Sequence, residues 1–385
     1  MLNKPLRLAF LVVDDRFGRP LPRPSFGAAP TALLQGFKEL GQDWIHVHVI
    51  SCVEHCLPAP EKLEENIWYH QIVLPHWRFL RTLHSGPVMR IRKLLKLIQP
   101  DIVHSQGTER WCAVSGALSG FPAVLTIHGH LKLILKVSRM RPNFYWKLQM
   151  LLGEFAIPRH MGVVCISRHV EHSVHKQAKQ HWLIPNAVRQ PFFAPAENTA
   201  SSKPRLLVIG TITENKQQCE ILDCFKRIHN RGLDFEAMFI GDNGNFGKYQ
   251  TQFGTEIVSA EKAGFARFLG RLEIDELITL MDSSHALVHF PKEEAFGLVV
   301  AESLARGLML FASSVGGIRD IAGGIDGVKL FSVNDFCQLE ETIISWIQSG
   351  AVKLPNACPV ISRLYAPASI AVQHCDVYEK HTQLT

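Results

Sequence analysis

Short apolar runs alternate with longer amphipathic stretches along the whole chain. In the first half, the pattern predicts strands at 6–13, 44–51, 101–105, 123–129, 163–167 and 181–185, and helices at 31–41 and 89–98. The second half restarts the alternation, with strands expected at 204–210, 235–242, 266–270, 286–291 and 308–314 and helices at 220–232, 274–284 and 296–307. Alternation at this spacing predicts parallel sheets with right-handed crossovers.

A polar stretch with two prolines, residues 186–204, separates the two halves and is interpreted as an interdomain linker. A length of 385 residues also favours two or three domains. We therefore expect an α/β protein of two doubly wound, Rossmann-like domains facing each other across a cleft, with ligands at the carboxyl ends of the strands. The N-terminal run LAFLVV is too short and too closely followed by acids to be a signal peptide, and no run reaches the roughly 18 apolar residues of a membrane span.

Positive charge gathers in the first half of the chain. Residues 1–186 contain 23 Lys and Arg against 12 Asp and Glu, and the stretches 76–100 and 130–153 contain six and five basic residues and no acid. Such patches attract anionic membrane surfaces or other polyanions, although a solvated basic face fits them equally well. Nucleic acid is disfavoured because no aromatic stacking platform accompanies the patches. The nine cysteines, without a CxxC pair, are typical of buried residues in a reducing cytoplasm.

The segment KEEAFGLVVAE, residues 292–302, contains the clearest candidate chemistry. It follows a predicted strand and leads into a predicted helix, so Gly297 would lie at a helix start, where free N–H groups bind phosphate. Glu294 would then face whatever the phosphate carries, and Glu302 could accept two vicinal hydroxyls such as those of a ribose. This arrangement describes a nucleotide-sugar site. Taken alone, the spacing also fits a solvated Glu302 and a Glu294 that favourably precedes a helix.

The same segment, extended to EEAFGLVVAESLARG, resembles the Glu-x7-Glu signature of retaining glycosyltransferases of the GT-B fold, family 4. Further similar elements follow in order along nearly the whole chain: HSQG (104–107), TIHG (126–129), IPNAV (184–188), VIGTITENK (208–216), FIGDNG (239–244), RFLGRL (267–272), VGGIRDI (315–321) and the tail 361–380. The resemblance implies an acceptor-binding domain at 1–188, a donor-binding domain at 203–361 and a C-terminal helix, 362–385, that crosses back to the first domain.

The resemblance also implies residue roles. Glu294 would bind donor-sugar hydroxyls, Lys216 would neutralise the donor phosphates, and His128 would lie near the reacting centre. A histidine after a strand is about as often purely structural. The remaining donor-site candidates are Gly27, Gly210, Thr211, Arg271, Phe296, Gly297, Leu298 and Glu302, of which Phe296 to Leu298 would hold the diphosphate through their backbone and Arg271 would lie at the base pocket.

Four positions depart from the family pattern. Thr211 stands where the family often has arginine, Gln217 where it has glycine, Pro291 where it has serine, and Asp320 where it has glutamate. Thr211 and Gln217 lie in or beside VIGTITENK (208–216), which resembles the donor-diphosphate loop of the family and is called the phosphate loop below. The four changes concern this loop and the donor site rather than the predicted fold.

The mechanism that the resemblance implies needs no metal and no cofactor besides the nucleotide-diphosphate sugar, with a UDP-sugar favoured over a GDP-sugar. The acceptor hydroxyl attacks on the leaving-group face, and the protein supplies positioning and electrostatic stabilisation. No Asp-x-Asp is found at a predicted strand end, and His169, His172 and His175 are spaced like a solvated helix stripe.

The expected function is sugar transfer to a glycan or lipid-linked acceptor in cell-surface polysaccharide or lipopolysaccharide synthesis, in the cytoplasm or at the inner face of the plasma membrane. Two alternatives stay open: a nucleotide-sugar 2-epimerase, and a partner subunit with a weakened site, which Thr211 and Gln217 suggest. A nicotinamide dehydrogenase is disfavoured because GDNGNFG lacks the dinucleotide-binding glycine spacing.

Overall fold

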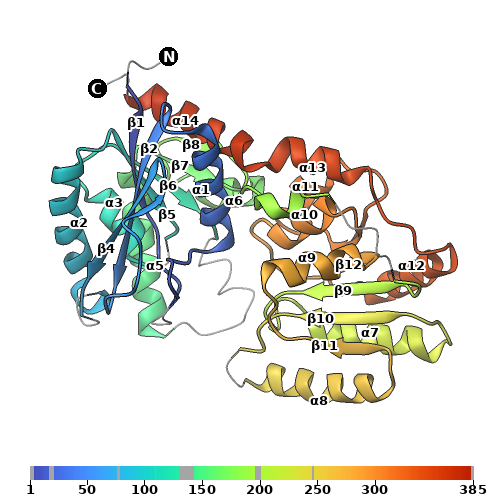
Figure 1. The fold of residues 1–385 in the computed structure, drawn as a ribbon. Coiled ribbons are helices and arrows are strands. Elements are labelled where there is room, and N and C mark those ends of the chain that lie inside the picture. Colours follow the sequence, from blue (N-terminus) through green and yellow to red (C-terminus); the bar gives the residue numbers. More distant parts are fainter. Residues whose placement is uncertain are drawn as a thin grey trace. The chain divides into compact units, whose positions relative to one another are not determined.

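The computed structural model describes residues 4–16, 21–75, 79–108, 110–129, 143–195, 201–244 and 247–382. The chain divides into two compact units, Met1–Arg189 with Tyr365–Thr385 (unit 1) and Gln190–Leu364 (unit 2). Both are parallel-sheet α/β units (Figure 1), which confirms the predicted fold class. None of the helices in the described ranges is long and apolar enough to cross a membrane.

Unit 1 is built on an eight-stranded sheet of order β3-β4-β2-β1-β5-β6-β7-β8, parallel except for the β3–β4 pair. Its strands are β1 (Leu6–Leu11), β2 (Ile45–Val53), β3 (Lys62–Glu64), β4 (Ile67–Val73), β5 (Ile102–Gln106), β6 (Ala123–Ile127), β7 (Gly162–Cys165) and β8 (His181–Leu183). Its helices are α1 (Ala28–Leu40), η2 (Leu80–Thr82), α2 (Ser85–Ile98), α3 (Trp111–Ala117), α5 (Phe144–Ala156), η3 (Ile157–Arg159), α6 (Arg168–Val174) and α14 (Pro367–Thr382).

Alternation along β1 explains why helices cover both faces of this sheet. Leu8 and Phe10 pack with residues of α1 and α14, whereas Ala9 and Leu11 pack with residues of α2 and α3 on the opposite face. Both sets are buried because successive side chains of a strand point to opposite faces. The C-terminal helix α14 therefore belongs to the core of unit 1.

Unit 2 has a six-stranded parallel sheet of order β11-β10-β9-β12-β13-β14. Its strands are β9 (Arg205–Ile209), β10 (Glu236–Ile240), β11 (Ala266–Phe268), β12 (Ala286–His289), β13 (Met309–Ser313) and β14 (Lys329–Phe331). Its helices are η4 (Gln190–Phe193), α7 (Gln218–Asn230), α8 (Lys248–Lys262), α9 (Ile274–Asp282), α10 (Leu298–Ala305), α11 (Ile318–Ala322), α12 (Phe336–Gln348) and α13 (Ala357–Tyr365). The order reverses between β9 and β12, which is the point where doubly wound sheets bind ligands.

The segment after Asn186 enters unit 2 as a packed element. The buried guanidinium of Arg306 pairs with Asp282 at 2.5 Å and donates hydrogen bonds to the carbonyl oxygens of Phe192 and Ala194. The first residues of the expected linker are thereby fixed to α9 and α10 rather than free in solution.

Candidate functional site

The candidate residues of unit 2 gather at the switch point of its sheet. Gly210 and Thr211 follow β9, and Glu294 to Leu298 follow β12, the strand beside it. Gly210 and Gly241 pack so closely that a Cβ on Gly241 would lie 2.1 Å from the carbonyl oxygen of Gly210. A side chain at position 241 would force the two backbones apart, whereas Gly210 is favoured by its φ of 149°, which other residues rarely adopt.

Gly297 begins α10 in the left-handed region, with φ of 101°. The loop before it rests on a second pair of glycines. The Gly317 N–H donates to the Glu294 carbonyl at 3.1 Å, and a Cβ on Gly316 would come within 1.7 Å of the same oxygen. Phe296 and Gly297 are buried and Leu298 is partly exposed, so the start of α10 lies at this edge of the sheet.

Glu294 is held by two partners. The Nζ of Lys216 lies 2.5 Å from the Glu294 Oε2, and the Nε2 of His289 lies 3.0 Å from the same oxygen. Burial alone would raise the pKa of Glu294, but the charge of Lys216 and the hydrogen bond with His289 together hold this pKa well below its usual range. Burial and the Lys216 charge lower the pKa of His289. The site therefore contains an ionised carboxylate between a cation and a neutral imidazole.

Lys216 lies in the loop between β9 and α7. Through Asn215 this loop is joined to the loop between β12 and α10 that contains Glu294, here called the glutamate loop. The Asn215 side chain donates to the Glu293 carbonyl at 2.9 Å and accepts from the Glu293 N–H at 3.0 Å, and the Lys292 N–H donates to the Asn215 carbonyl. These contacts join residues 78 positions apart in the chain. They set the distance between the ammonium of Lys216 and the carboxylate of Glu294.

Gln217 keeps the backbone conformation that a glycine would favour. Its φ is 58°, and its side-chain amide donates to the carbonyl of Phe290 at 2.7 Å. Thr211 is exposed, and the side chain of Gln218 caps its carbonyl at 3.0 Å. The departure at 217 thus preserves the loop shape, whereas that at 211 removes a positive charge from it.

The other unit 2 candidates lie on the same edge or just behind it. Arg271 is exposed in the loop after β11, next to Gly270, whose carbonyl accepts from the Gly241 N–H at 2.9 Å. Glu302 is only 4% exposed on α10, so it is a buried carboxylate and not a solvated helix residue. Within the described residues, no cluster of three metal-binding side chains is found.

His128 and Gly27 belong to unit 1. His128 follows β6, and its Nε2 lies 2.8 Å from the Gln106 Oε1. Burial lowers its pKa to about 4, against the opposing effect of a hydrogen bond with Asn186, so the ring is neutral at pH 7. Gly27 is the exposed N-cap of α1, where an added Cβ would meet only Pro30, at 3.8 Å.

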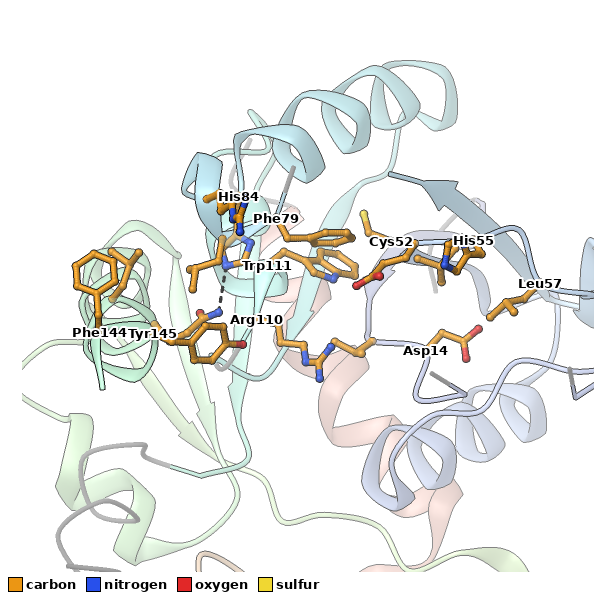
Figure 2. A pocket seen from close by; sticks show the side chains of 17 residues that line it. Asp14, Cys52, His55, Leu57, Phe79, His84, Arg110, Trp111, Phe144 and Tyr145 are labelled. Carbon is orange, nitrogen blue, oxygen red and sulfur yellow. Dashed lines mark hydrogen bonds between the residues drawn. The ribbon is translucent and has the colours of Figure 1, made fainter. Parts of the chain in front are cut away.

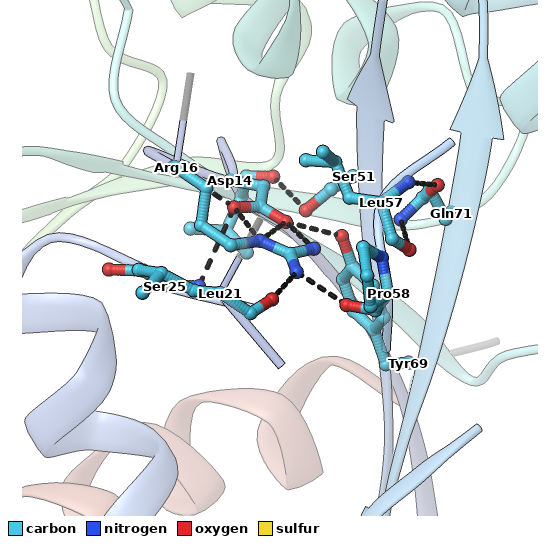
Figure 3. A network of polar contacts seen from close by, with 10 residues as sticks. Asp14, Arg16, Leu21, Ser25, Ser51, Leu57, Pro58, Tyr69 and Gln71 are labelled. Carbon is cyan, nitrogen blue, oxygen red and sulfur yellow. Dashed lines mark hydrogen bonds and ion pairs between the residues drawn. The ribbon is translucent and has the colours of Figure 1, made fainter. Parts of the chain in front are cut away.

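The loop after β1 is anchored by a buried ion pair (Figure 3). Arg16 pairs with Asp14 at 2.6 Å, and the Tyr69 hydroxyl donates to the same carboxylate at 2.8 Å. The guanidinium also donates to the carbonyls of Leu21 and Pro58, from two different loops. The start of the segment between β1 and α1 is therefore fixed to the sheet of unit 1.

The sequence did not single out His289 as a member of the site. A signal was present, since a histidine ends the otherwise apolar strand ALVH, three residues before the candidate segment 292–302. Asn215 was also missed, because its role depends on a contact between distant loops.

Both halves of the chain match family models of glycosyltransferases. The model of "Glycosyl transferases group 1" matches residues 190–359, and that of "Glycosyltransferase Family 4" matches residues 31–189. The chain is 23% identical over 305 residues to the GPI3 subunit of phosphatidylinositol N-acetylglucosaminyltransferase from Saccharomyces cerevisiae, covering 75% of this chain but only 65% of that protein. It is 25% identical to an uncharacterized glycosyltransferase of Methanocaldococcus jannaschii, over 78% of this chain and 82% of that one.

Solved structures share the fold at low sequence identity. Sucrose-phosphate synthase from Thermosynechococcus elongatus matches with a TM-score of 0.77 and 16% identity, over 99% of this chain and all of the other. HepE from Anabaena, in complex with UDP and glucose, matches with a TM-score of 0.72 and 15% identity, over 97% of this chain and all of the other.

Proposed function

The chain belongs to the glycosyltransferases of the GT-B fold, family 4 type, and from this we propose that it transfers a sugar from a nucleotide-diphosphate sugar to an acceptor hydroxyl with retention of configuration and without a metal. The observation that carries the proposal is the Lys216–Glu294–His289 cluster beside the start of α10. A cation and a helix N-terminus favour a diphosphate, and an ionised carboxylate favours sugar hydroxyls.

In this proposal the residues have distinct tasks. Lys216 and the first N–H groups of α10 stabilise the negative charge that develops on the departing diphosphate. Glu294 accepts hydrogen bonds from the donor sugar, and the buried Glu302 accepts them from the ribose. Arg271 lies beside the base. His128, neutral at pH 7, contributes a hydrogen bond and not a charge.

A panel of UDP-, GDP- and ADP-sugars in a thermal-shift assay tests donor binding, because a ligand of the native state raises the melting temperature. We expect a UDP-sugar to give the largest shift. Proton NMR of the product then gives the anomeric configuration, and the same reaction in EDTA tests metal independence. An inverted product or a loss of activity in EDTA would contradict the corresponding part. Donor epimerised without acceptor would indicate the isomerase alternative.

The acceptor is proposed to belong to cell-surface polysaccharide or lipopolysaccharide synthesis at an anionic membrane on its cytoplasmic side. The support is the exposed face of α2, which combines Arg90, Lys93 and Lys96 with exposed Met89 and Leu97. A helix face of this kind favours the interface of an anionic bilayer. Flotation with liposomes of phosphatidylcholine, with and without phosphatidylglycerol, tests it. Equal binding to both would refute the electrostatic account.

A further inference from the structure

The element HSQG at the end of β5 contains two side chains, His104 and Gln106, to which the proposed function assigns no task. Both lie on the face of the unit 1 sheet that α1 and α14 cover, since Ile102, two residues before His104, packs with residues of those helices. His104 is fully buried, and Gln106 is 7% exposed. Buried polar side chains are normally hydrogen-bonded, so the partners of these two show what they hold in place.

His104 is held by two hydroxyls from different elements. Its Nε2 lies 2.7 Å from the Thr126 Oγ1 on β6, and its Nδ1 lies 2.6 Å from the Tyr378 hydroxyl on α14. Burial holds the pKa of His104 well below its usual range, so the ring is neutral, with one donor and one acceptor nitrogen. A hydroxyl can donate or accept, so both nitrogens are satisfied without Gln106. The ring is therefore fixed between β6 and α14.

The amide nitrogen of Gln106 lies over the face of the His104 ring. It is 3.0 Å from Nε2 and 3.3 Å from Nδ1. The lone pairs of the two ring nitrogens point in different directions within the ring plane, so an atom this close to both lies above that plane. An N–H group is attracted by the negative face of an aromatic ring, whereas an amide oxygen is repelled by it. The amide of Gln106 is therefore oriented with its nitrogen toward His104 and its oxygen away from it.

The oxygen of Gln106 meets the ring of His128, which follows β6. The Gln106 Oε1 lies 2.8 Å from the His128 Nε2. An amide oxygen only accepts hydrogen bonds, so the His128 Nε2 carries the proton. Because this ring is neutral at pH 7, its Nδ1 is then the acceptor nitrogen. A second side chain, Asn186, also hydrogen-bonds to the ring, but the contact with Gln106 is the one that determines the tautomer.

We propose that Gln106 is a positioning residue of the transfer reaction, which holds the His128 ring with its Nε2 protonated and its Nδ1 as an acceptor. His104, fixed between β6 and α14, holds the Gln106 amide in the orientation that this requires. A substrate group that meets the His128 Nδ1 must therefore donate a hydrogen, which a hydroxyl does and an ionised phosphate oxygen does not. The inference rests on the proposed function, which it deepens by assigning the hydrogen-bonding state of His128.

The tautomer is tested on the full chain, with nitrogen-15-labelled histidine, by NMR correlation of the imidazole nitrogens and protons at pH 8. The signals of His128 are those that disappear in His128→Gln. We expect native His128 to be protonated at Nε2. In Gln106→Glu a carboxylate replaces the amide, so we expect the same tautomer and a pKa of His128 raised by about 1–3 pH units. A side chain that only filled space at position 106 would not produce this rise.

Catalysis is measured as release of UDP from the UDP-sugar that gives the largest thermal shift. Gln106→Met keeps the length of the side chain and removes both amide groups. We expect it to lower kcat about tenfold, because one hydrogen bond that holds His128 is lost. The donor KM should change less than about twofold, since most donor-site candidates lie in unit 2. Gln106→Glu retains an accepting oxygen, so its kcat at pH 8 should stay within about threefold of the native value.

Gln71→Met is the matched control. Gln71 lies in β4 of the same sheet, and its amide makes two hydrogen bonds with the backbone of Leu57, at 2.8 and 3.1 Å. The kcat of this variant should stay within about twofold of the native value. A kcat that falls equally in Gln71→Met and Gln106→Met would overturn the proposal. A native His128 protonated at Nδ1, or a pKa of His128 that is unchanged in Gln106→Glu, would overturn it as well.

These outcomes can be told apart from a failure of the proposed function, because the NMR measurements need neither donor nor acceptor. A native chain with the expected tautomer and the expected pKa rise in Gln106→Glu, but without release of UDP, would refute the proposed function and leave the assignment of His128 standing. An active native chain whose kcat is unchanged in Gln106→Met would overturn the positioning role alone.

Discussion

Lys216 is the residue whose removal tests the candidate donor site most directly. Replacing it with methionine keeps the length of the side chain and removes its charge. The substitution leaves the Glu294 carboxylate, whose side chain is 16% exposed, with His289 as its remaining partner in the cluster. We expect Lys216→Met to lower both the stability of unit 2 and the rate of sugar transfer.

The magnitudes follow from the burial of the pair. Removing one partner of a fully buried ion pair costs about 3–5 kcal/mol. Lys216 retains 24% exposure and His289 still binds Glu294, so a loss of about 2 kcal/mol in the free energy of unfolding is expected here. Loss of a charged hydrogen bond to the departing diphosphate removes about 1.5–3 kcal/mol of transition-state stabilisation, which corresponds to roughly 10- to 150-fold in kcat/KM.

The assay combines release of the nucleotide diphosphate with urea unfolding, in a double-mutant cycle with Glu294→Gln. A coupling energy of about 1 kcal/mol or more is expected for side chains in contact. Lys292→Met is the control, since Lys292 lies in the loop that holds Glu294, two residues before it, and its ammonium is not part of the cluster. If kcat/KM falls as much in Lys292→Met as in Lys216→Met, the departing diphosphate is stabilised by the overall positive charge of the site and not by Lys216 in particular, and our assignment is wrong.

Three further predictions concern single contacts. His289→Leu should lower kcat/KM about tenfold with little change in donor affinity, because one hydrogen bond to Glu294 is lost while Lys216 remains; an unchanged rate would exclude His289 as a positioning residue. Arg306→Met should destabilise unit 2 by about 3–5 kcal/mol in urea unfolding, since it removes the guanidinium that pairs with the buried carboxylate of Asp282, and a change below about 1 kcal/mol would contradict this. Unit 1 should lose stability as pH falls from 6.5 toward 4, because burial lowers the pKa of His128 to about 4 and unfolding restores this pKa to about 6.5. The expected loss in the free energy of unfolding from this one group is about 2 kcal/mol at pH 5. Tryptophan fluorescence reports on unit 1, which contains six of the seven tryptophans, and urea midpoints that coincide at pH 7.5 and pH 5 would refute the linkage.

The sequence predicted the fold well where burial alone determines the pattern. The strands β9, β12 and β13 are continuous apolar runs because helices cover both sides of a parallel sheet. The pattern did not predict β4 and α8, since both keep many partly exposed or exposed positions and so lack a strong apolar period.

The site was predictable only as far as local spacing extends. The segment 292–302 indicated a carboxylate before a helix start, and Gly297 begins that helix in the structure. The pairing of Glu294 with Lys216 depends on the contacts of Asn215 between two distant loops, and periodicity carries no information about such contacts. The cavity of unit 1 that residues of α5 help to line (Figure 2) could not be predicted for the same reason, because its lining comes from five separate segments of the chain.

The two departures in the phosphate loop have different physical consequences. A left-handed backbone costs a non-glycine residue about 1–2 kcal/mol, and the buried hydrogen bond from Gln217 to the Phe290 carbonyl offsets a comparable amount. Glutamine at this position therefore has a less favourable backbone conformation than glycine, but it gains a hydrogen bond to the segment between β12 and α10. The change to Thr211 has no such compensation, since an exposed hydroxyl replaces a cation. Lys216 is the basic side chain of this loop, and it is bound to Glu294. Under the proposed function the same ammonium group also binds the donor diphosphate, so donor binding and the placement of Glu294 are expected to depend on one residue.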